Sequence, residues 1–333
     1  MPSLKVIRTR IVSVKSTQKI TKAMKMVAGA RLNRAQQAIT ALRPYAVKTG
    51  EMLRSVTAGS AAATTTTGPV LVDGRPAAAP ADGEVAFDEG AALHPFLAER
   101  PVANVLIVLF SADRGLCGAF NTNVNKMAER RWRELEREGK KVSFVTVGRK
   151  GKEFLGRRGA NVLQDFPKPY EGLDIKKASA IAGVIAAKFK AKEIDAVYIV
   201  FNEFKSAMTQ KSTLTQLLPL SAAAATAVVT PPKDAHTTAE PPVDDARAEF
   251  LFEPDKKALL RSLVPMYLEV TLFRAMLESQ AGFFGAQMTA MDSATRNAKD
   301  MIKRLSLAYN RARQAAITKE LMEIIGGAEA LKE

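Results

Sequence analysis

The residues with the most chemical character stand in one short loop, SADRGLCGAFN, from Ser111 to Asn121. The loop follows the apolar run VANVLIVLF, which we interpret as a buried strand. Glycines at a strand-to-helix turn can present backbone N–H groups to a phosphate, and this is the usual ligand position in a parallel sheet. The spacing matches neither G-x-G-x-x-G nor G-x-x-x-x-G-K-[ST]. We therefore expect a structural turn pinned by Asp113 and Arg114, with a small phosphate-binding enzyme as an open alternative.

Other catalytic chemistry finds little support in the sequence. Cys117, the single cysteine, needs a nearby base to act as a nucleophile, and the two histidines, His94 and His236, lie in segments rich in Ala, Thr and Pro. One cysteine and two histidines also do not make up a zinc cluster. We expect no catalytic residue, no cofactor and no metal. Four methionines are expected to fill core positions rather than to bind a ligand: Met24, Met26, Met288 and Met291.

The charge of the chain points to acidic partners. The net charge is +15, and the stretch TQKITKAMKMVAGARLNRA, from Thr17 to Ala35, contains no acid. Composition alone admits nucleic acid, an anionic membrane surface or an acidic protein as partner. The scarcity of aromatic residues among the basic ones argues against single-stranded nucleic acid. A basic coiled coil bound to duplex phosphates stays an alternative.

The apolar residues of this basic N-terminal segment lie on two faces of the expected helix. At about 100° per residue, Ile7 and Ile11 fall on one face, whereas Ile20 and Val27 fall nearly opposite. We therefore expect the helix to meet two different surfaces. Pro44 would end or kink it, unless it begins a further helical piece.

The composition divides the chain into five predicted segments. Residues 1–58 form an N-terminal helix, 59–101 a low-complexity insertion, 102–220 an α/β domain, 221–249 a second insertion and 250–333 a C-terminal helix. Strands alternate with helices in the middle segment, and KSTLTQLLPL is expected to be an edge strand. This alternation is typical of a small, mostly parallel, Rossmann-like sheet.

The C-terminal segment has the most regular pattern. Its apolar residues are spaced 4,3,4,3 from Leu277 to Ala316, which indicates a coiled coil. We expect its helix to stop at Gly326–Gly327 and to pair with the N-terminal helix in antiparallel fashion. The predicted fold class is thus α/β, a long antiparallel coiled coil of the two terminal helices plus a Rossmann-like middle domain. The predicted seam includes Phe284, Met288, Met291, Ala298, Ile302, Leu305 and Tyr309.

Three motifs, in order and position, resemble the γ subunit of F-type ATP synthases of the bacterial type. They are TQKITKAMKMVAGARLNRAQ, SADRGLCGAFN and YNRARQAAITKELMEIIGGAEAL. The resemblance implies a rotor shaft rather than an enzyme. It implies a coiled coil inside the hexameric ring of α and β subunits, a middle domain that docks with the ε subunit and the c-subunit ring, no nucleic acid and no membrane span. The place implied is peripheral, on the cytoplasmic face of the bacterial inner membrane.

The resemblance also implies contact residues. Met24 and Lys25 match positions that face the acidic lever loop of a β subunit, and Phe250, Phe252 and Glu253 match the foot that meets the c ring and ε. Four residues match positions that contact the catch loops of β subunits: Arg313, Gln314, Thr318 and Glu320. An apolar end is expected to turn in a hydrophobic bearing: Leu321, Ile324, Ile325 and Leu331.

The chain departs from the family pattern in GFFGAQMTAM. Phe283 stands where the family usually has an acid, and Gln287 stands where it usually has an arginine. We therefore expect no ion pair between these two positions. Gly282 and Gly285 are expected to loosen the helix locally. The cysteine-bearing insert of chloroplast members is missing, and we expect no thiol switch.

Overall fold

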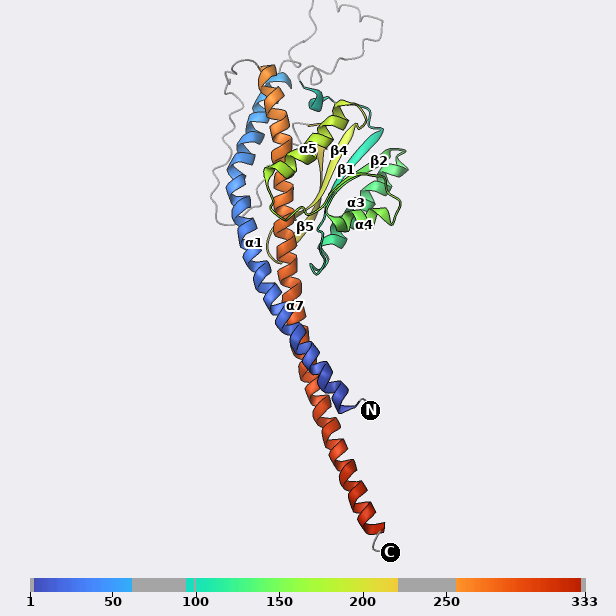
Figure 1. Cartoon of the computed structure of the whole chain (residues 1–333). Helices are drawn as coiled ribbons and strands as arrows, with labels where there is room; N and C mark the ends of the chain where they lie inside the picture. Colours follow the sequence, from blue (N-terminus) through green and yellow to red (C-terminus); the bar gives the residue numbers. More distant parts are fainter. Residues whose placement is uncertain (1–2, 62–93, 99, 221–255, 331–333) are drawn as a thin grey trace, which may run out of the picture.

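The computed structural model describes residues 3–61, 94–98, 100–220 and 256–330. Helices α1 (Leu4–Ala61) and α7 (Lys256–Ala330) run side by side, and an α/β domain packs against one half of α7 (Figure 1). We call α1 and α7 together the helix pair. The predicted fold class, an antiparallel pair of terminal helices with a Rossmann-like middle domain, is confirmed.

Contacts between α1 and α7 run in opposite order along the two helices, which shows that the helix pair is antiparallel. The Lys25 ammonium meets the Asp292 carboxylate at 2.5 Å, whereas the Tyr45 hydroxyl lies 2.9 Å from the sulfur of Met266. With 75 residues at about 1.5 Å each, α7 is on the order of 110 Å long. It extends past the start of α1, and the C-terminus projects freely in Figure 1.

The middle domain holds one five-stranded sheet in the order β3-β2-β1-β4-β5. Strands β1 to β4 are parallel, and β5 pairs antiparallel with β4 at the edge, as predicted for KSTLTQLLPL. The strands are β1 (Asn104–Phe110), β2 (Lys141–Val147), β3 (Val162–Phe166), β4 (Ala196–Phe204) and β5 (Gln210–Leu218). The helices are η2 (Pro95–Leu97), α3 (Phe120–Arg137), α4 (Arg149–Gly156) and α5 (Ile175–Lys190).

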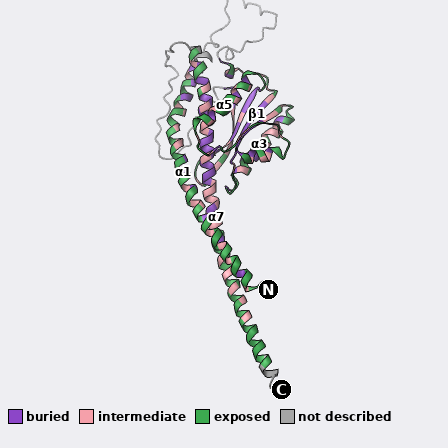
Figure 2. Cartoon of the chain, viewed as in Figure 1, coloured by how far each residue is buried: buried purple, intermediate pink, exposed green. Residues whose placement is uncertain are grey.

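The sheet is the middle of three layers, and α7 belongs to one of them. Successive residues of β1 point to opposite faces. Leu106 and Val108 pack in the core with α5 and α7, whereas Val105 and Ile107 pack in the core with α3 and α4. Both faces of β1 are buried, which accounts for its continuous apolar sequence. Buried residues accordingly cover α7 along the sheet and become rare toward its C-terminal end (Figure 2).

Helix α1 presents two faces, as its sequence predicts. Ile20 and Val27 are 57% and 52% exposed, so the second apolar face is uncovered in the single chain. The face turned to α7 repeats every three or four residues, as in a coiled coil. Its buried members include Ile7, Thr21, Ala28, Leu32, Ala35, Leu53 and Val56.

One expectation about local structure was wrong, one open alternative is decided and one strand was not anticipated. Helix α7 continues through Gly326–Gly327 to Ala330, because a glycine costs a helix only about 1 kcal/mol and does not end it. Pro44 lies inside α1 and does not end that helix. The sequence pattern missed β3, an edge strand whose residues are only partly buried. The predicted insertions, residues 59–101 and 221–249, lie mostly outside the described residues.

Candidate functional site

The loop after β1 uses its polar groups to hold neighbouring backbone. The Ser111 hydroxyl accepts a hydrogen bond from the Gly151 amide at 2.8 Å, and the Asp113 carboxylate accepts one from the Arg149 amide at 2.8 Å. Both amides belong to the start of α4, which would otherwise leave its first N–H groups available to an anion. Arg114 reaches Glu171 at 3.5 Å on the surface. These contacts are those of a structural turn.

The groups considered for nucleophilic or metal chemistry have structural roles. Cys117 is buried, and burial raises the pKa of its thiol, which disfavours the reactive thiolate. His94 accepts a hydrogen bond from the Phe96 amide at 3.2 Å and so caps η2. His236 lies outside the described residues. Within the described ranges, no group of three or more His, Cys, Asp and Glu side chains could hold a metal ion.

The carboxyl end of the sheet is filled by helix α7. Ligands of open α/β sheets bind outside the carboxyl ends of the strands, where the chain connections diverge to the two sides. In this chain β1 continues through α3 to β2 on one side, and β4 lies on the other side. Ala112 after β1 and Ala207 after β4 pack in one cluster with Ala281 and Phe283 of α7. The usual nucleotide position therefore holds protein side chains.

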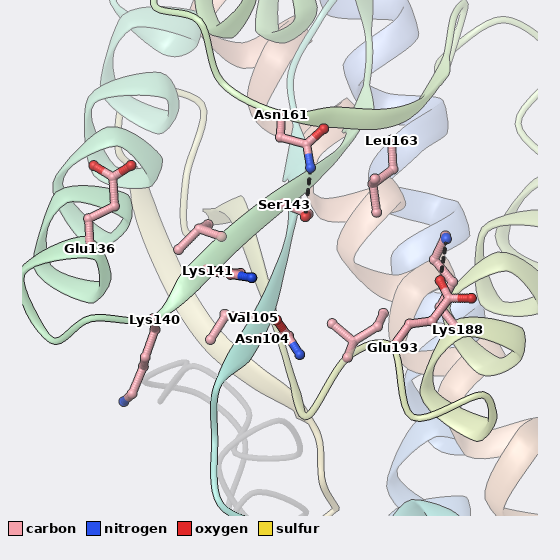
Figure 3. A pocket seen from close by; sticks show the side chains of 12 residues that line it. Asn104, Val105, Glu136, Lys140, Lys141, Ser143, Asn161, Leu163, Lys188 and Glu193 are labelled. Carbon is pink, nitrogen blue, oxygen red and sulfur yellow. Dashed lines mark hydrogen bonds and ion pairs between the residues drawn. The ribbon is translucent and has the colours of Figure 1, made fainter.

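A hollow of about 470 Å³ lies at the opposite end of the sheet, beside the amino ends of the parallel strands (Figure 3). Four of its polar side chains pair with one another. The Lys188 ammonium meets the Glu193 carboxylate at 2.8 Å, and the Asn161 amide donates to the Ser143 hydroxyl at 3.1 Å. The hollow is therefore a depression in the surface that is lined in part by paired polar side chains.

The candidate contact residues of α1 lie at the edge of the seam between the two helices. Met24 is half-buried, and the Lys25 side chain is 43% exposed. The Lys25 ammonium binds Asp292, which also meets Arg296 at 3.2 Å. The hydrogen bond from Lys25 holds the pKa of Asp292 below its usual value. Sequence reasoning named Lys25 and missed its partner, because the pairing joins residues 267 positions apart.

The candidate contact residues of α7 lie near its free end. Arg313, Gln314, Thr318 and Glu320 are all exposed. Leu321, Ile324 and Ile325 are more than half exposed as well, whereas Leu331 lies outside the described residues. Apolar side chains left in water on this scale are typical of a surface that a partner covers. Phe250, Phe252 and Glu253 lie outside the described residues.

The residues assigned to the coiled-coil seam of α7 lie on the side turned to α1 or to the domain. Phe284, Met291 and Ala298 are buried. The sulfur of Met288 would lie 3.5 Å from a Cβ added at Gly29, so the Met288 side chain packs against α1 at that level. Three further members are half-buried: Ile302, Leu305 and Tyr309.

The departures in GFFGAQMTAM have a structural explanation. Phe283 is 6% exposed and packs among aromatic rings, and Gln287 is half-buried. Helix α7 continues without interruption through Gly282 and Gly285, and their expected effect on its local stability stays a prediction. A Cβ at Gly285 would lie 3.1 Å from the carbonyl oxygen of Ala207, and the glycine thus permits a close approach of the β4–β5 turn.

One buried ionic pair gave no recognisable sequence signal. Glu278 is 6% exposed, and its carboxylate accepts a hydrogen bond from the Arg274 guanidinium at 2.7 Å. Burial raises the pKa of Glu278, and Arg274 offsets part of that effect. The two residues are one helical turn apart, but such spacing is common on exposed helices, so only the structure shows that the carboxylate of this pair is buried while the Arg274 side chain stays 24% exposed.

Comparisons with known proteins agree with this architecture. The family model described as ATP synthase matches residues 3–331. The ATP synthase gamma chain of Sorangium cellulosum is 51% identical over 335 residues, and that of Geotalea uraniireducens is 44% identical over 332 residues. Both alignments cover 100% of this chain and 100% of the relative.

Solved structures of central-stalk subunits share the fold at low sequence identity. A chain of the Euglena gracilis mitochondrial ATP synthase aligns with a TM-score of 0.60 and 18% identity, over 98% of this chain and 94% of that one. A chain from the central stalk and c-ring of the Tetrahymena thermophila enzyme gives 0.55 and 21%, over 83% of this chain and 99% of that one. None of the described helices is long and apolar enough to cross a membrane. From the full-length family match and these relatives, the chain belongs to the family of ATP synthase gamma chains.

Proposed function

We propose that this chain is the central rotor shaft of an ion-translocating ATP synthase. In this role it carries the rotation of the c ring to the catalytic β subunits, and it catalyses no reaction itself. The observation that carries the proposal is the helix pair, a long two-stranded rod that leaves an apolar, exposed tip at the end of α7. The alternative function, a positively charged coiled coil that binds nucleic acid, has no support from the family match.

The proposed partners are the α and β subunits of a catalytic hexamer, the ε subunit and the c ring. Met24 and Lys25 would face the acidic lever loop of a β subunit. Lys25 is suited to this contact because its ammonium has three donors and binds Asp292 at one side only. Attraction between exposed charges is weakly directional, so it favours association without locking one angle of the rotor.

The free end of α7 is the second proposed contact with the hexamer. Arg313, Gln314, Thr318 and Glu320 would meet the catch loops of β subunits, and all four are exposed. Beyond them the apolar tip would turn in a hydrophobic bearing, where contacts have no preferred direction. Phe250, Phe252 and Glu253 are proposed as the foot that meets the c ring and ε.

The proposed mechanism requires a stiff rod. As ions cross the membrane, the c ring turns the foot, and the helix pair presses successive β subunits through states that bind, form and release ATP. Each push biases a conformational equilibrium that the β subunit already has. The shaft holds no nucleotide, in keeping with the filled carboxyl end of its sheet. The protein would lie peripherally on the cytoplasmic face of a bacterial inner membrane.

Reconstitution tests the proposal. The purified chain should hydrolyse no ATP, and it should restore ion-coupled ATP hydrolysis when it is combined in vesicles with the hexamer, the other rotor subunits and the c ring. Deletion of residues 310–333 should abolish or sharply reduce this coupling. Lys303→Ala, which removes an exposed charge of the same helix outside the proposed contact, is the matched control. Normal coupling by the deletion variant would argue against the contact at the tip.

A further inference from the structure

The middle domain is attached to α7 at two successive places along the helix. From Leu260 to Met276, α7 packs with α5 and the sheet in the main apolar core. From Ser279 to Thr289, it packs against the loops at the carboxyl end of the sheet. We call this second contact the joint. The first contact consists mainly of apolar side chains, whose packing has little directionality, together with one hydrogen bond from the Ser179 hydroxyl to the Glu269 carboxylate at 2.8 Å.

An aromatic cluster forms the centre of the joint. Phe283 of α7 lies with its ring centroid 5.8 Å from that of Phe120 at the start of α3, and 5.6 Å from that of Tyr170 in the loop after β3. It also contacts the ring of Phe284, at 5.3 Å. The Phe120 contact is edge-to-face, one of the geometries that aromatic pairs prefer. One side chain of the helix thus contacts two separate parts of the domain, the start of α3 and the loop after β3.

Two glycines bring the domain unusually close to the helix. A Cβ at Gly282 would lie 3.3 Å from the Phe120 ring, and a Cβ at Gly285 would lie 3.1 Å from the Ala207 carbonyl oxygen. Both distances are tighter than ordinary contacts, so a side chain at either position would push the domain outward. Glycine makes an α-helix less stable than alanine does. At these two positions the absence of a side chain permits the close approach of the domain.

Directional hydrogen bonds surround the aromatic cluster. The Gln280 side-chain amide donates to the Tyr170 carbonyl oxygen at 3.1 Å. The Thr289 hydroxyl donates to the Ala207 carbonyl oxygen at 3.2 Å. These bonds join α7 to the loops after β3 and β4, and they fix the rotation of the helix relative to the sheet as well as its distance.

We infer that this joint, with Phe283 as its central residue, holds the α/β domain at a fixed angle to the helix pair and so transmits torque between them. The inference rests on the proposed function. A domain attached only through the first contact could rock about it, whereas a second contact farther along α7, centred on Phe283, resists that motion. Phe283 acts through the position of the domain and is therefore a positioning residue. Since the cluster is apolar, the joint does not depend on an ion pair that salt would screen.

The test compares two losses of a phenyl ring in the reconstituted complex. Phe283→Ala opens the joint. Phe154→Ala removes a partly buried ring on the opposite face of the sheet, where Arg158 lies over it at 3.6 Å, and leaves α7 untouched. ATP hydrolysis and ion uptake are measured together in vesicles, with the unfolding temperature of each chain. We expect Phe283→Ala to retain hydrolysis while the ions moved per ATP fall several-fold, and Phe154→Ala to keep the wild-type ratio.

A second pair of variants decides the matter if Phe283→Ala does not assemble. Gly285→Leu forces the β4–β5 turn away from α7, whereas Gly183→Leu adds the same side chain at an open position on α5. Gly285→Leu should lower the ratio of ions to ATP and Gly183→Leu should not. Equal ratios in each pair would overturn the inference. A wild-type chain that fails to restore coupling would instead overturn the proposed function, so the two failures are distinguishable.

Discussion

The hydroxyl of Thr21 lies 2.8 Å from the hydroxyl of Thr295, although 274 residues separate them in the chain. The two threonines face each other in the otherwise largely apolar seam of the helix pair, and Thr21 is 8% exposed. A polar pair at one level of a coiled coil favours a single register, because any shift would leave a buried hydroxyl against an apolar side chain.

Replacing the threonine pair should reveal coupling between the two positions. Each hydroxyl carries one proton and has a carbonyl oxygen of its own helix within reach, at 3.1 Å for Thr21 and 2.7 Å for Thr295, so one threonine donates across the seam while the other donates within its helix. Thr21→Val and Thr295→Val should therefore each cost only about 1 kcal/mol of unfolding free energy. The double variant should cost less than the sum. Urea unfolding of the four chains gives the coupling energy, and strict additivity would contradict a direct interaction.

Reversing both charges of the Lys25–Asp292 pair should destabilise the chain less than reversing one charge alone. Asp292→Lys places a cation beside Lys25 and Arg296 and should destabilise the chain. Adding Lys25→Asp should restore part of the loss. Because the pKa of Asp292 is lowered in the folded chain, its contribution is present above the ordinary value of 3.8 and is lost as pH falls through the folded value. Asp292→Asn should thus unfold like the wild type in strong acid and more readily at neutral pH.

The buried pair of Arg274 and Glu278 should behave differently when one or both partners are removed. Arg274→Met leaves a buried carboxylate without its ionic partner and should cost about 3 kcal/mol of unfolding free energy. The double replacement by methionine should lie near the wild type, because apolar side chains of similar volume often replace a buried ion pair without loss. Thermal unfolding at neutral pH compares the variants. A double variant as unstable as the single one would contradict this account.

The same glutamate predicts a pH dependence of opposite sign to that of Asp292. Burial raises the pKa of Glu278, while Arg274 and Arg43 lower it and Glu203 raises it further. The folded chain therefore binds this proton more tightly than the unfolded chain. Its contribution to stability is complete below the ordinary pKa of 4.5 and is lost as pH rises through the raised value. Glu278→Gln should flatten this part of the curve of unfolding free energy against pH, and an unchanged slope would exclude Glu278 as its source.

Gly148 should be intolerant of any side chain. Its φ is +104°, and an added Cβ would lie 2.3 Å from the carbonyl oxygen of Ser111. Gly148→Ala should therefore lower the unfolding free energy by more than about 1 kcal/mol. Gly156→Ala, in the last turn of α4 with open space around it, should be neutral or slightly stabilising. Urea unfolding compares the two, and equal effects would show that steric contact at Ser111 is unimportant.

Much of the fold could be predicted because the patterns were long or strongly apolar. The unbroken run of β1 and the repeat from Leu277 to Ala316 each indicate an element whatever surrounds it. Strand β3 was missed because it is a short edge strand, VLQDF, whose apolar residues are interrupted by Gln164 and Asp165 and which has no buried residue. The contact residues proposed from the family resemblance stay predictions, and those of the foot lie outside the described residues.

Pattern and composition predict that two long helices pair, that their surface is basic and that an α/β domain lies between them. Periodicity reports which residues avoid water, and it does so through local geometry that every helix or strand shares. The residues that cover them are known from the three-dimensional packing alone. That Phe283 packs between Phe120 and Tyr170, and that α7 occupies the ligand position of the sheet, depends on contacts between distant segments. Such contacts have no period in the sequence, because their partners are brought together only by the packing of the whole chain.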